Sequence, residues 1–557
     1  MAQTNAEIAE MLRANADLME IAGENAFRVN AFRRAADAVR AHDRALTAQA
    51  DLTEIPGVGA GIAGVLREIL TSGTFATFEE LQEQLPGSLL ALLDIPGVGA
   101  KTAARLYREL NVTSLTDLEE ALRSGRLGTL KGMGPKAQAR IAEGLVFVQR
   151  RSGRTSIGIA LPLALRLADR LGSITGKPVF IAGSARRMCV TVGNVDLVAV
   201  GDDVAAVLNA AAGLPDVAHE LERDGETATF DLHQGIMLRV RVTSQDRLGN
   251  TLIEVTGSEA HLRKLGSAAS LPAAATEEAC YAALGLPFIA PELREDRGEV
   301  EAAREGRLPR LIEVTDLRGD LHLHTTWSDG GASPLEMADA AAKRGYAYLA
   351  ITDHSGGLGI AGGLKPERLA EQRAEIDGLQ DRSPVQLLAG SEVEVHRDGR
   401  LDFDDAILAG LDLVVASLHS GLRQPSTEFT DRLCATIQNC NVDIIAHPTG
   451  RLVERRQGAD IDWSRVFAAA RETATVLEIN ADPARLDMDD ETARAAFAAG
   501  CLISIDSDAH HPESLALVRY GVGVARRAWI EPQQVVNTWP LDDLLAWLRE
   551  RRVPQDV

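Results

Sequence analysis

The spacing of apolar residues divides the chain into stretches of different character. Through roughly the first 150 residues, apolar positions recur at i, i+3, i+4 and i+7, which predicts a succession of amphipathic helices. From Ile157 to about Val255 short runs dominate, and the alternation around Val195 and Leu197 predicts strands with connecting helices. A segment rich in Ala, Glu and Arg follows. After Arg318, apolar runs alternate with helical stretches, which is the rhythm of a parallel α/β barrel or sheet.

A short glycine-containing element recurs in the predicted helical part. It reads IPGVG from Ile55, IPGVG from Ile95 and LKGMG from Leu130, and each copy runs directly into a helical pattern. Two glycines allow a tight turn that points backbone N–H groups outward at a helix N-terminus, where they can bind phosphate. This is the helix-hairpin-helix signature, and it predicts phosphate contacts at Gly57, Gly59, Gly97, Gly99, Lys101, Gly132, Gly134 and Lys136. Two alternatives are turns that only close helix hairpins and a repeat that belongs to a helical solenoid.

Composition and charge narrow the classes of protein that fit. At 557 residues the chain is too long for one core, so we expect several domains. The net charge of −22 argues against coating nucleic acid by bulk electrostatics, but focused contacts through backbone dipoles stay compatible with DNA binding. No apolar stretch approaches the ~20 residues of a membrane span. The N-terminus lacks the apolar core of a signal peptide, and the five cysteines form no C-x-x-C pair. We expect a cytoplasmic protein.

Histidines and carboxylates end the apolar runs of the last part of the chain, from about Asp320 to His511. The residues in question are His322, His324, Asp329, His354, Glu392, His419, His447, Asp508 and His510. The carboxyl ends of parallel strands meet on one face of a barrel, so these side chains are expected to converge. Nine nitrogen and oxygen ligands are too many for one ion and suit two or three divalent ions of the manganese, zinc or iron type.

Ions held this close together would activate water near neutral pH and stabilise charge on a phosphoryl group. The pattern therefore predicts a phosphoesterase. The alternative, buried histidines satisfied by hydrogen bonds, is reasonable for any single position but not for nine in this order. Glu394 shares a strand face with Glu392 and is the reserve ligand.

The order HLH, SDG, TDH, GSE, LHS, AHP and SDAH resembles that of the PHP (polymerase and histidinol phosphatase) domain, a distorted β/α barrel. AHPTGRL and LEINADPARLD resemble the version fused to bacterial family X DNA polymerases. The resemblance implies hydrolysis of DNA phosphoesters in the bacterial cytosol or nucleoid, by a 3′→5′ exonuclease, an apurinic-site endonuclease or a 3′-phosphatase. It also implies Asn480 and Arg451 as substrate contacts.

The same resemblance extends over the whole chain and implies five domains. Residues 1–85 resemble a small helical DNA-end-binding domain and 86–150 helix-hairpin-helix fingers. Residues 151–245 resemble an α+β nucleotidyltransferase palm, 246–313 a shortened thumb with a linker, and 314–557 the PHP domain. The implied partners are gapped, nicked or 3′-ended DNA and deoxynucleoside triphosphates, with no membrane.

The palm-like segment departs from the family pattern where metal-holding carboxylates are needed. GSARR matches the triphosphate-holding element, with Gly183, Ser184 and Arg187 as nucleotide contacts. The resemblance places the three palm carboxylates at Asn194, Asp196 and Met237, so that only Asp196 survives. An amide and a thioether are poor ligands for magnesium. We therefore expect a degenerate polymerase site.

Three alternative functions fit the same residues. One is a gap-filling polymerase that uses manganese or magnesium at Asp196 with a nearby acid. Asp231 lies close enough to Met237 in sequence for the third carboxylate position to fall on it if the alignment is shifted. The second is a scaffold that binds DNA ends without chemistry. The third is a small-molecule phosphatase, which would have no use for three phosphate-binding turns.

Overall fold

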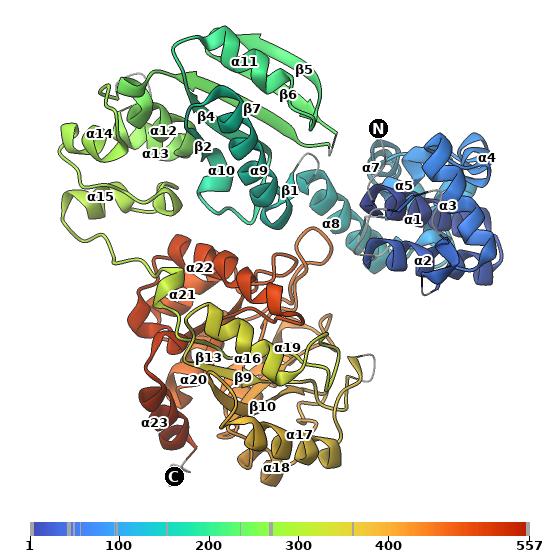
Figure 1. Ribbon diagram of the computed structural model, residues 1–557. Helices are drawn as coiled ribbons and strands as arrows, with labels where there is room; N and C mark the ends of the chain where they lie inside the picture. Colours follow the sequence, from blue (N-terminus) through green and yellow to red (C-terminus); the bar gives the residue numbers. More distant parts are fainter. Residues whose placement is uncertain are drawn as a thin grey trace. The chain divides into compact units, whose positions relative to one another are not determined.

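The computed structural model describes residues 5–41, 46–47, 51–55, 57–93, 95, 98–151, 154–233, 235–266, 271–358 and 361–552 (Figure 1). The chain divides into two compact units, Met1–Ser152 and Gly153–Val557. None of the helices in these ranges is both long enough and apolar enough to span a bilayer.

The first unit is helical, as its 3.6-residue periodicity predicts. The α-helices of its described part are α1 (Asn5–Ala22), α2 (Ala26–Ala41), α3 (Ala60–Ser72), α4 (Ala76–Gln84), α5 (Leu90–Leu93), α6 (Ala100–Leu110), α7 (Leu115–Arg123) and α8 (Pro135–Arg151). A single apolar core that includes Ile8 and Leu145 joins them. The helical fold predicted for this part is confirmed.

A five-stranded mixed sheet with the order β2-β4-β7-β6-β5 begins the second unit. Its strands are β2 (Val179–Ala182), β4 (Asn194–Val200), β5 (Val217–Asp224), β6 (Thr227–Leu232) and β7 (Met237–Thr243). Helices α9 (Ile157–Thr175) and α11 (Val204–Ala212) pack on one face, against the apolar residues that alternate along β4 and β7 (Figure 1). The short helix α10 (Gly183–Arg186) follows β2, and a two-stranded ribbon pairs β1 (Thr155–Ser156) with β3 (Thr191–Val192).

The segment predicted as thumb and linker forms helices around its own small core. They are α12 (Leu248–Thr256), α13 (Glu259–Leu265), α14 (Glu277–Ala283) and α15 (Glu299–Arg304). In this core the guanidinium of Arg294 is fully buried and pairs with Glu277 at 2.6 Å. Glu277 also pairs with Arg186 of α10 at 2.5 Å, so a buried ion network ties the thumb to the palm.

A seven-stranded parallel sheet follows, ordered β14-β13-β12-β11-β10-β9-β8. Its strands are β8 (Gly319–Asp320), β9 (Tyr348–Ile351), β10 (Gln386–Glu394), β11 (Leu413–Ser417), β12 (Ile444–Ile445), β13 (Val476–Asn480) and β14 (Ile503–Asp506). The helices between and after them are α16 (Pro334–Lys343), α17 (Pro366–Leu379), α18 (Asp405–Ala409), α19 (Ser426–Ile437), α20 (Trp463–Thr473), α21 (Asp490–Ala498), α22 (Val518–Arg527) and α23 (Leu541–Arg551). This confirms the predicted parallel α/β arrangement.

The parallel sheet curls into a nearly closed barrel. A bridge between Leu323 and Ala509 joins the chain after β8 to the chain after β14, and the N–H of Asp508 donates to the carbonyl of His322 at 3.0 Å. Apolar residues fill the interior toward the amino ends of the strands, where they pack against α23. The carboxyl ends of the strands, which carry the polar residues, therefore lie at the other opening of the barrel.

The palm segment and the barrel contact each other through a buried ion pair, a hydrogen bond and close packing. Arg527 of α22 pairs with Glu295 of the thumb segment at 2.7 Å and donates to the carbonyl of Arg187 at 3.0 Å. A Cβ added to Gly523, one turn earlier on α22, would lie 2.7 Å from the Cε of Met188. Only glycine allows this close approach, so the loop after α10 is packed tightly on α22.

Candidate metal centre

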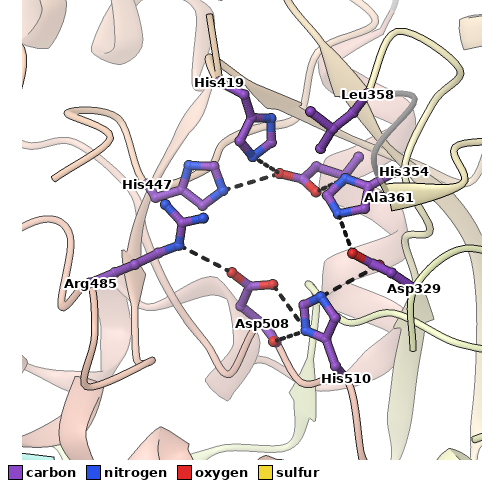
Figure 2. A pocket seen from close by; sticks show the side chains of 10 residues that line it. Asp329, His354, Leu358, Ala361, His419, His447, Arg485, Asp508 and His510 are labelled. Atoms are coloured by element: carbon purple, nitrogen blue, oxygen red, sulfur yellow. Dashed lines mark hydrogen bonds and ion pairs between the residues drawn. The ribbon is translucent and has the colours of Figure 1, made fainter. Parts of the chain in front are cut away.

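The side chains that end the apolar runs converge at the carboxyl ends of the barrel strands (Figure 2). Alternation along each strand explains the convergence, because residues of one parity point into the barrel. Ala350 lies in the apolar interior and His354 follows it with the same parity beyond the end of β9. Val415 and His419 repeat the relation at β11. Apolar residues thus fill the base of the barrel, and potential metal ligands surround its mouth.

Glu392, on β10, lies at the centre of this group. Its Oε2 is 2.6 Å from Nδ1 of His354, and its Oε1 is 3.1 Å from Nε2 of His447. Three more imidazole nitrogens lie 3.6 Å from its carboxylate, those of His322, His324 and His419. A buried carboxylate with five histidines around it suits a site for divalent metal ions.

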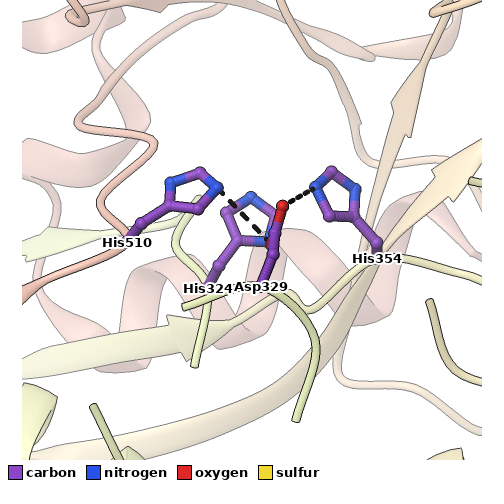
Figure 3. A group of neighbouring side chains, drawn as sticks. All are labelled: His324, Asp329, His354 and His510. Carbon is purple, nitrogen blue, oxygen red and sulfur yellow. Dashed lines mark ion pairs between the residues drawn. The ribbon is translucent and has the colours of Figure 1, made fainter. Parts of the chain in front are cut away.

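Donor atoms of the predicted ligands gather in sets whose members lie within 4.8 Å of one another. The sets are His324, Asp329, His354 and His510 (Figure 3); His322, Glu392 and His447; and His322, His324 and Asp508. His419 stands beside the second set through Glu392. Sets of this size and this nitrogen and oxygen composition suit divalent metal ions.

Buried nitrogens without a hydrogen-bond partner point to the same conclusion. Within the described chain, Nε2 of His322, Nδ1 of His324 and Nδ1 of His447 have none. A buried polar atom left unpaired costs about 1–3 kcal/mol, which argues that such atoms have another partner. Divalent cations bound by these nitrogens would satisfy them.

The ionisation of the cluster follows from burial and opposite charge. Burial alone would lower the pKa of His354, but the carboxylates of Glu392 and Asp329 outweigh it and raise that pKa to about 10. At His447 burial dominates, Arg485 adds to it, and the pKa falls to about 3. Burial opposes ionisation of Glu392, yet the imidazoles around it, His354 first, hold its pKa well below the ordinary value. A metal ion that bound His354 would have to displace this proton, so its binding would weaken as the pH falls.

Two carboxylates behind the cluster, those of Glu478 and Glu394, orient its histidines. Oε1 of Glu478 lies 2.6 Å from Nδ1 of His322, and its Oε2 accepts the backbone N–H of His447 at 2.6 Å. Glu394 lies 2.8 Å from Nδ1 of His419, a position that orients this histidine and leaves Nε2 toward Glu392. Glu478 was not among the predicted residues, because LEIN reads as an ordinary buried strand.

Replacing Glu478 with Ala should weaken metal binding about 10- to 100-fold, the usual effect of removing a carboxylate that orients a histidine ligand. A chromophoric chelator in competition with the protein measures the affinity. Glu472→Ala, which removes an exposed carboxylate on α20, is the matched control. Equal affinities of the two variants would contradict the assignment.

A cavity of about 380 Å³ opens over the cluster (Figure 2). Besides cluster members, its wall contains Leu358, Ala361 and Arg485. Arg485 is the only arginine or lysine of the described chain in this wall. A volume of this order is typical of sites for small ligands.

The two predicted substrate contacts have other partners within the protein. Asn480 donates to Asp508 at 3.1 Å and accepts the N–H of Asp482, so it fixes a cluster member and the following loop. Arg451 does not line the cavity. Its guanidinium donates to the carbonyl of Arg485 at 2.8 Å and to that of Leu486. Arg451 therefore supports the loop that carries Arg485.

The positions assigned to palm carboxylates lie side by side on the sheet face opposite α9 and α11. Asn194 and Met237 are partners across the parallel β4–β7 pair, and Asp231 pairs with Met237 from β6. Oδ1 of buried Asp196 accepts hydrogen bonds at 2.7 Å from both the amide of Asn194 and Nε of Arg239. Burial raises the pKa of Asp196, and Arg239 opposes that rise. A protein cation thus occupies one side of the surviving carboxylate.

The GSARR element is engaged by the thumb. Gly183 has φ of 64°, and a Cβ there would collide with the carboxylate of Asp196, so this position requires glycine. Ser184 follows it in α10 and is half-buried. Arg187 donates from Nε to Glu295 at 2.8 Å and from Nη1 to the carbonyl of Thr256 at 2.6 Å. The side chain predicted to hold a triphosphate is therefore already bound to two protein acceptors.

The three glycine turns share one local structure. In each, an N–H donates three residues back at 2.9–3.0 Å: Val58 to Ile55, Val98 to Ile95 and Met133 to Leu130. Gly57 and Gly132 have φ of 90° and 87°. Gly59 and Gly99 are the N-caps of α3 and α6, and Gly134 directly precedes α8. The described glycines of the turns are exposed, as are Lys101 and Lys136, whereas Gly97 lies outside the described residues.

Comparisons with known families agree with this arrangement. Residues 3–75 match the helix-hairpin-helix domain, and 49–113 and 89–146 match the SAM-like helix-hairpin-helix tandem. Residues 320–481 match the PHP domain. The probable phosphatase of Thermoanaerobacter sp. (strain X514) is 30% identical over 252 residues, which cover 42% of this chain and 95% of that protein.

One relative spans the whole chain. The DNA polymerase/3′-5′ exonuclease PolX of Bacillus subtilis (strain 168) is 37% identical over 566 aligned residues, covering 98% of this chain and 99% of that protein. An alignment of this extent includes the helical unit, the five-stranded sheet, helices α12 to α15 and the barrel. The chain therefore belongs to the bacterial family X DNA polymerases that carry a C-terminal PHP domain.

Proposed function

We propose that this protein is a DNA-repair nuclease whose barrel hydrolyses phosphoester bonds at DNA 3′ ends, with two or three divalent ions such as manganese or zinc. The observation that carries the proposal is the set of buried histidines around Glu392, beneath a cavity lined by Arg485. The name of the B. subtilis relative includes 3′-5′ exonuclease, which supports the same direction of cleavage.

The proposed ligands are His322, His324, Asp329, His354, Glu392, His419, His447, Asp508 and His510. Divalent ions bound to them would polarise a phosphoryl group and lower the pKa of water. The protein's part is to hold the ligands rigidly, and Glu478 does so by fixing the ring of His322. The cavity admits a group about the size of one nucleotide, so we propose that an unpaired 3′ end enters it.

DNA is the proposed substrate because of the first unit. Three turns with outward backbone N–H groups would hold successive phosphates on a strand, and Lys101 and Lys136 stand exposed beside two of them. The probable phosphatase of Thermoanaerobacter aligns with only 42% of this chain, so more than half of the chain has no counterpart in that alignment.

We also propose that the palm has lost nucleotidyl transfer. Asn194 and Met237 supply no anion, and Arg239 already pairs with Asp196. The thumb holds Arg187 through Glu295. The palm would then serve to bind DNA ends or gaps.

A second candidate is a gap-filling polymerase that also carries the nuclease. Two observations favour it: the relative that aligns with 98% of this chain is named a DNA polymerase, and Asp231 lies on the palm face next to Met237. Asp196 and Asp231 with manganese, and bound deoxynucleoside triphosphates, would be its requirements.

One gapped duplex separates these functions. Its primer is labelled at the 5′ end and incubated with manganese, with and without deoxynucleoside triphosphates. We expect shortening that does not depend on nucleotides, stops with a chelator, is lost in a His322→Ala, His324→Ala double variant and is unchanged in Asp196→Ala. Extension that disappears in Asp196→Ala would establish the second candidate. Binding without shortening or extension would leave only an end-binding scaffold.

A further inference from the structure

Arg485 projects from the loop after β13 into the cavity above the histidine cluster (Figure 2). About 20% of its side chain is exposed, so the guanidinium is mostly removed from bulk water but remains open to the cavity. Its Nε is 3.8 Å from Oδ2 of Asp508, too far for a hydrogen bond. Within the described chain the guanidinium donates no hydrogen bond to protein.

An unsaturated guanidinium in this place calls for an anionic partner. Asp508 is already committed, since its Oδ1 lies 3.2 Å from Nε2 of His324 and its Oδ2 accepts from Asn480. The nearby cation Arg456 donates instead to the carbonyl of Gly450. Arg485 is thus an arginine of the cavity wall with donors that no described protein group accepts.

The loop around Arg485 is braced from behind. Arg451 binds the carbonyls of Arg485 and Leu486 and pairs with Asp489 at 3.3 Å. The N–H of Arg485 donates to the carbonyl of Asp482 at 2.8 Å. A side chain on so well-fixed a backbone is pre-positioned, which is what recognition of a developing charge requires.

We propose that Arg485 binds the non-bridging oxygens of the phosphoryl group that is attacked, on the side of the cavity near Asp508 and His447. The planar fork of a guanidinium matches two oxygens of one phosphate. In the transition state of phosphoryl transfer, negative charge is spread over those oxygens. A fixed cation beside them therefore stabilises the transition state. Arg485 is on this account a catalytic residue. The assignment rests on the proposed phosphoesterase function.

The test compares Arg485→Met with Arg455→Met, which removes an exposed arginine from outside the cavity wall. Bound metal is counted by mass spectrometry, folding by thermal melting, and hydrolysis of a 3′-labelled single strand by initial rates. Thymidine 5′-monophosphate, a mononucleotide product, is titrated by calorimetry into the manganese-loaded proteins. Arg485→Met should retain its metal and melting temperature, lose about 100-fold or more in kcat/KM, and bind the mononucleotide more weakly. Arg485→Lys should recover part of both.

Two results would overturn the assignment: hydrolysis by Arg485→Met within about threefold of Arg455→Met, or a loss of activity that merely follows lost metal. If Arg485→Met melts early, the same comparisons are made with Arg485→Lys and Arg485→Gln, which keep a polar side chain of similar length. The hydrolysis rate and the mononucleotide affinity should then both fall from the wild type to Arg485→Lys and further to Arg485→Gln. Equal values in the three proteins would reject the role of Arg485. Inactive wild-type protein would instead reject the proposed function.

Discussion

The Glu392→Gln variant is expected to lose most of its bound metal and at least ~100-fold of its phosphoester-hydrolysing activity, the upper end of what residues that only orient ligands contribute. The amide keeps the size of the side chain but removes its charge. No other carboxylate in the described cluster is near so many imidazoles, with His354 at 2.6 Å and His447 at 3.1 Å. Cations shared between the ligand sets would lose their common anion.

Metal content by mass spectrometry and exonuclease rates with manganese check this result. Glu394→Gln is the matched control, because Glu394 lies two residues further on the same strand and contacts one cluster histidine, His419 at 2.8 Å. The amide oxygen of the variant can still accept a hydrogen bond from His419, so the loss should be about tenfold, the lower end for residues that orient a ligand. A Glu392→Gln protein with wild-type metal content and rate would remove Glu392 from the centre of the site.

The Arg527→Met variant is expected to unfold with about 3 kcal/mol less free energy than the wild type in urea. Removal of one partner of a buried ion pair typically costs ~3–5 kcal/mol, since the other charge stays buried. Arg527 is 7% exposed and contacts Glu295 at 2.7 Å and Asp490 at 3.1 Å. The lower end is expected because Glu295 keeps Arg187, and Asp490 keeps Arg297.

Arg526→Met, at the preceding position of α22, is the control. Arg526 pairs with Glu292 at 2.7 Å but is 21% exposed, so solvent screens the pair and its loss should cost about 1 kcal/mol. Urea denaturation followed by circular dichroism and by exonuclease activity reports the second unit. If the two substitutions lower the free energy of unfolding equally, the larger contribution assigned to Arg527 is wrong.

Much of the site could be predicted because it follows a simple rule. In a barrel of buried strands the apolar run ends where the solvent-facing mouth begins, so the first histidine or carboxylate after each run is marked by position. His354 and His419 are found this way. The alternation of Val195 and Leu197 likewise predicted a strand, and the pairing of β4 with β7 places Met237 opposite Asn194.

Residues that act through a tertiary contact escaped prediction. Glu478 lies inside a buried strand and is recognisable only when its carboxylate is seen 2.6 Å from His322. Arg239 belongs to an alternating strand pattern that also describes an ordinary exposed face, and its pairing with Asp196 depends on strand register. Arg451 and Arg485 are both loop arginines near the mouth. Sequence alone does not say which of the two points inward.

The packing of the palm on α22 bears on how the protein can be dissected. Ile157, Ala160, Ala185 and Val192 of the palm belong to the same apolar core as the barrel. A fragment begun at residue 314 would uncover this surface and the face of α22 at Gly523 that Met188 covers. It would also remove two of the acceptors of Arg527, Glu295 and the carbonyl of Arg187. An exposed apolar patch of this kind promotes aggregation. The cut that seems natural from the order of domains is therefore the one that would yield a poorly soluble enzyme.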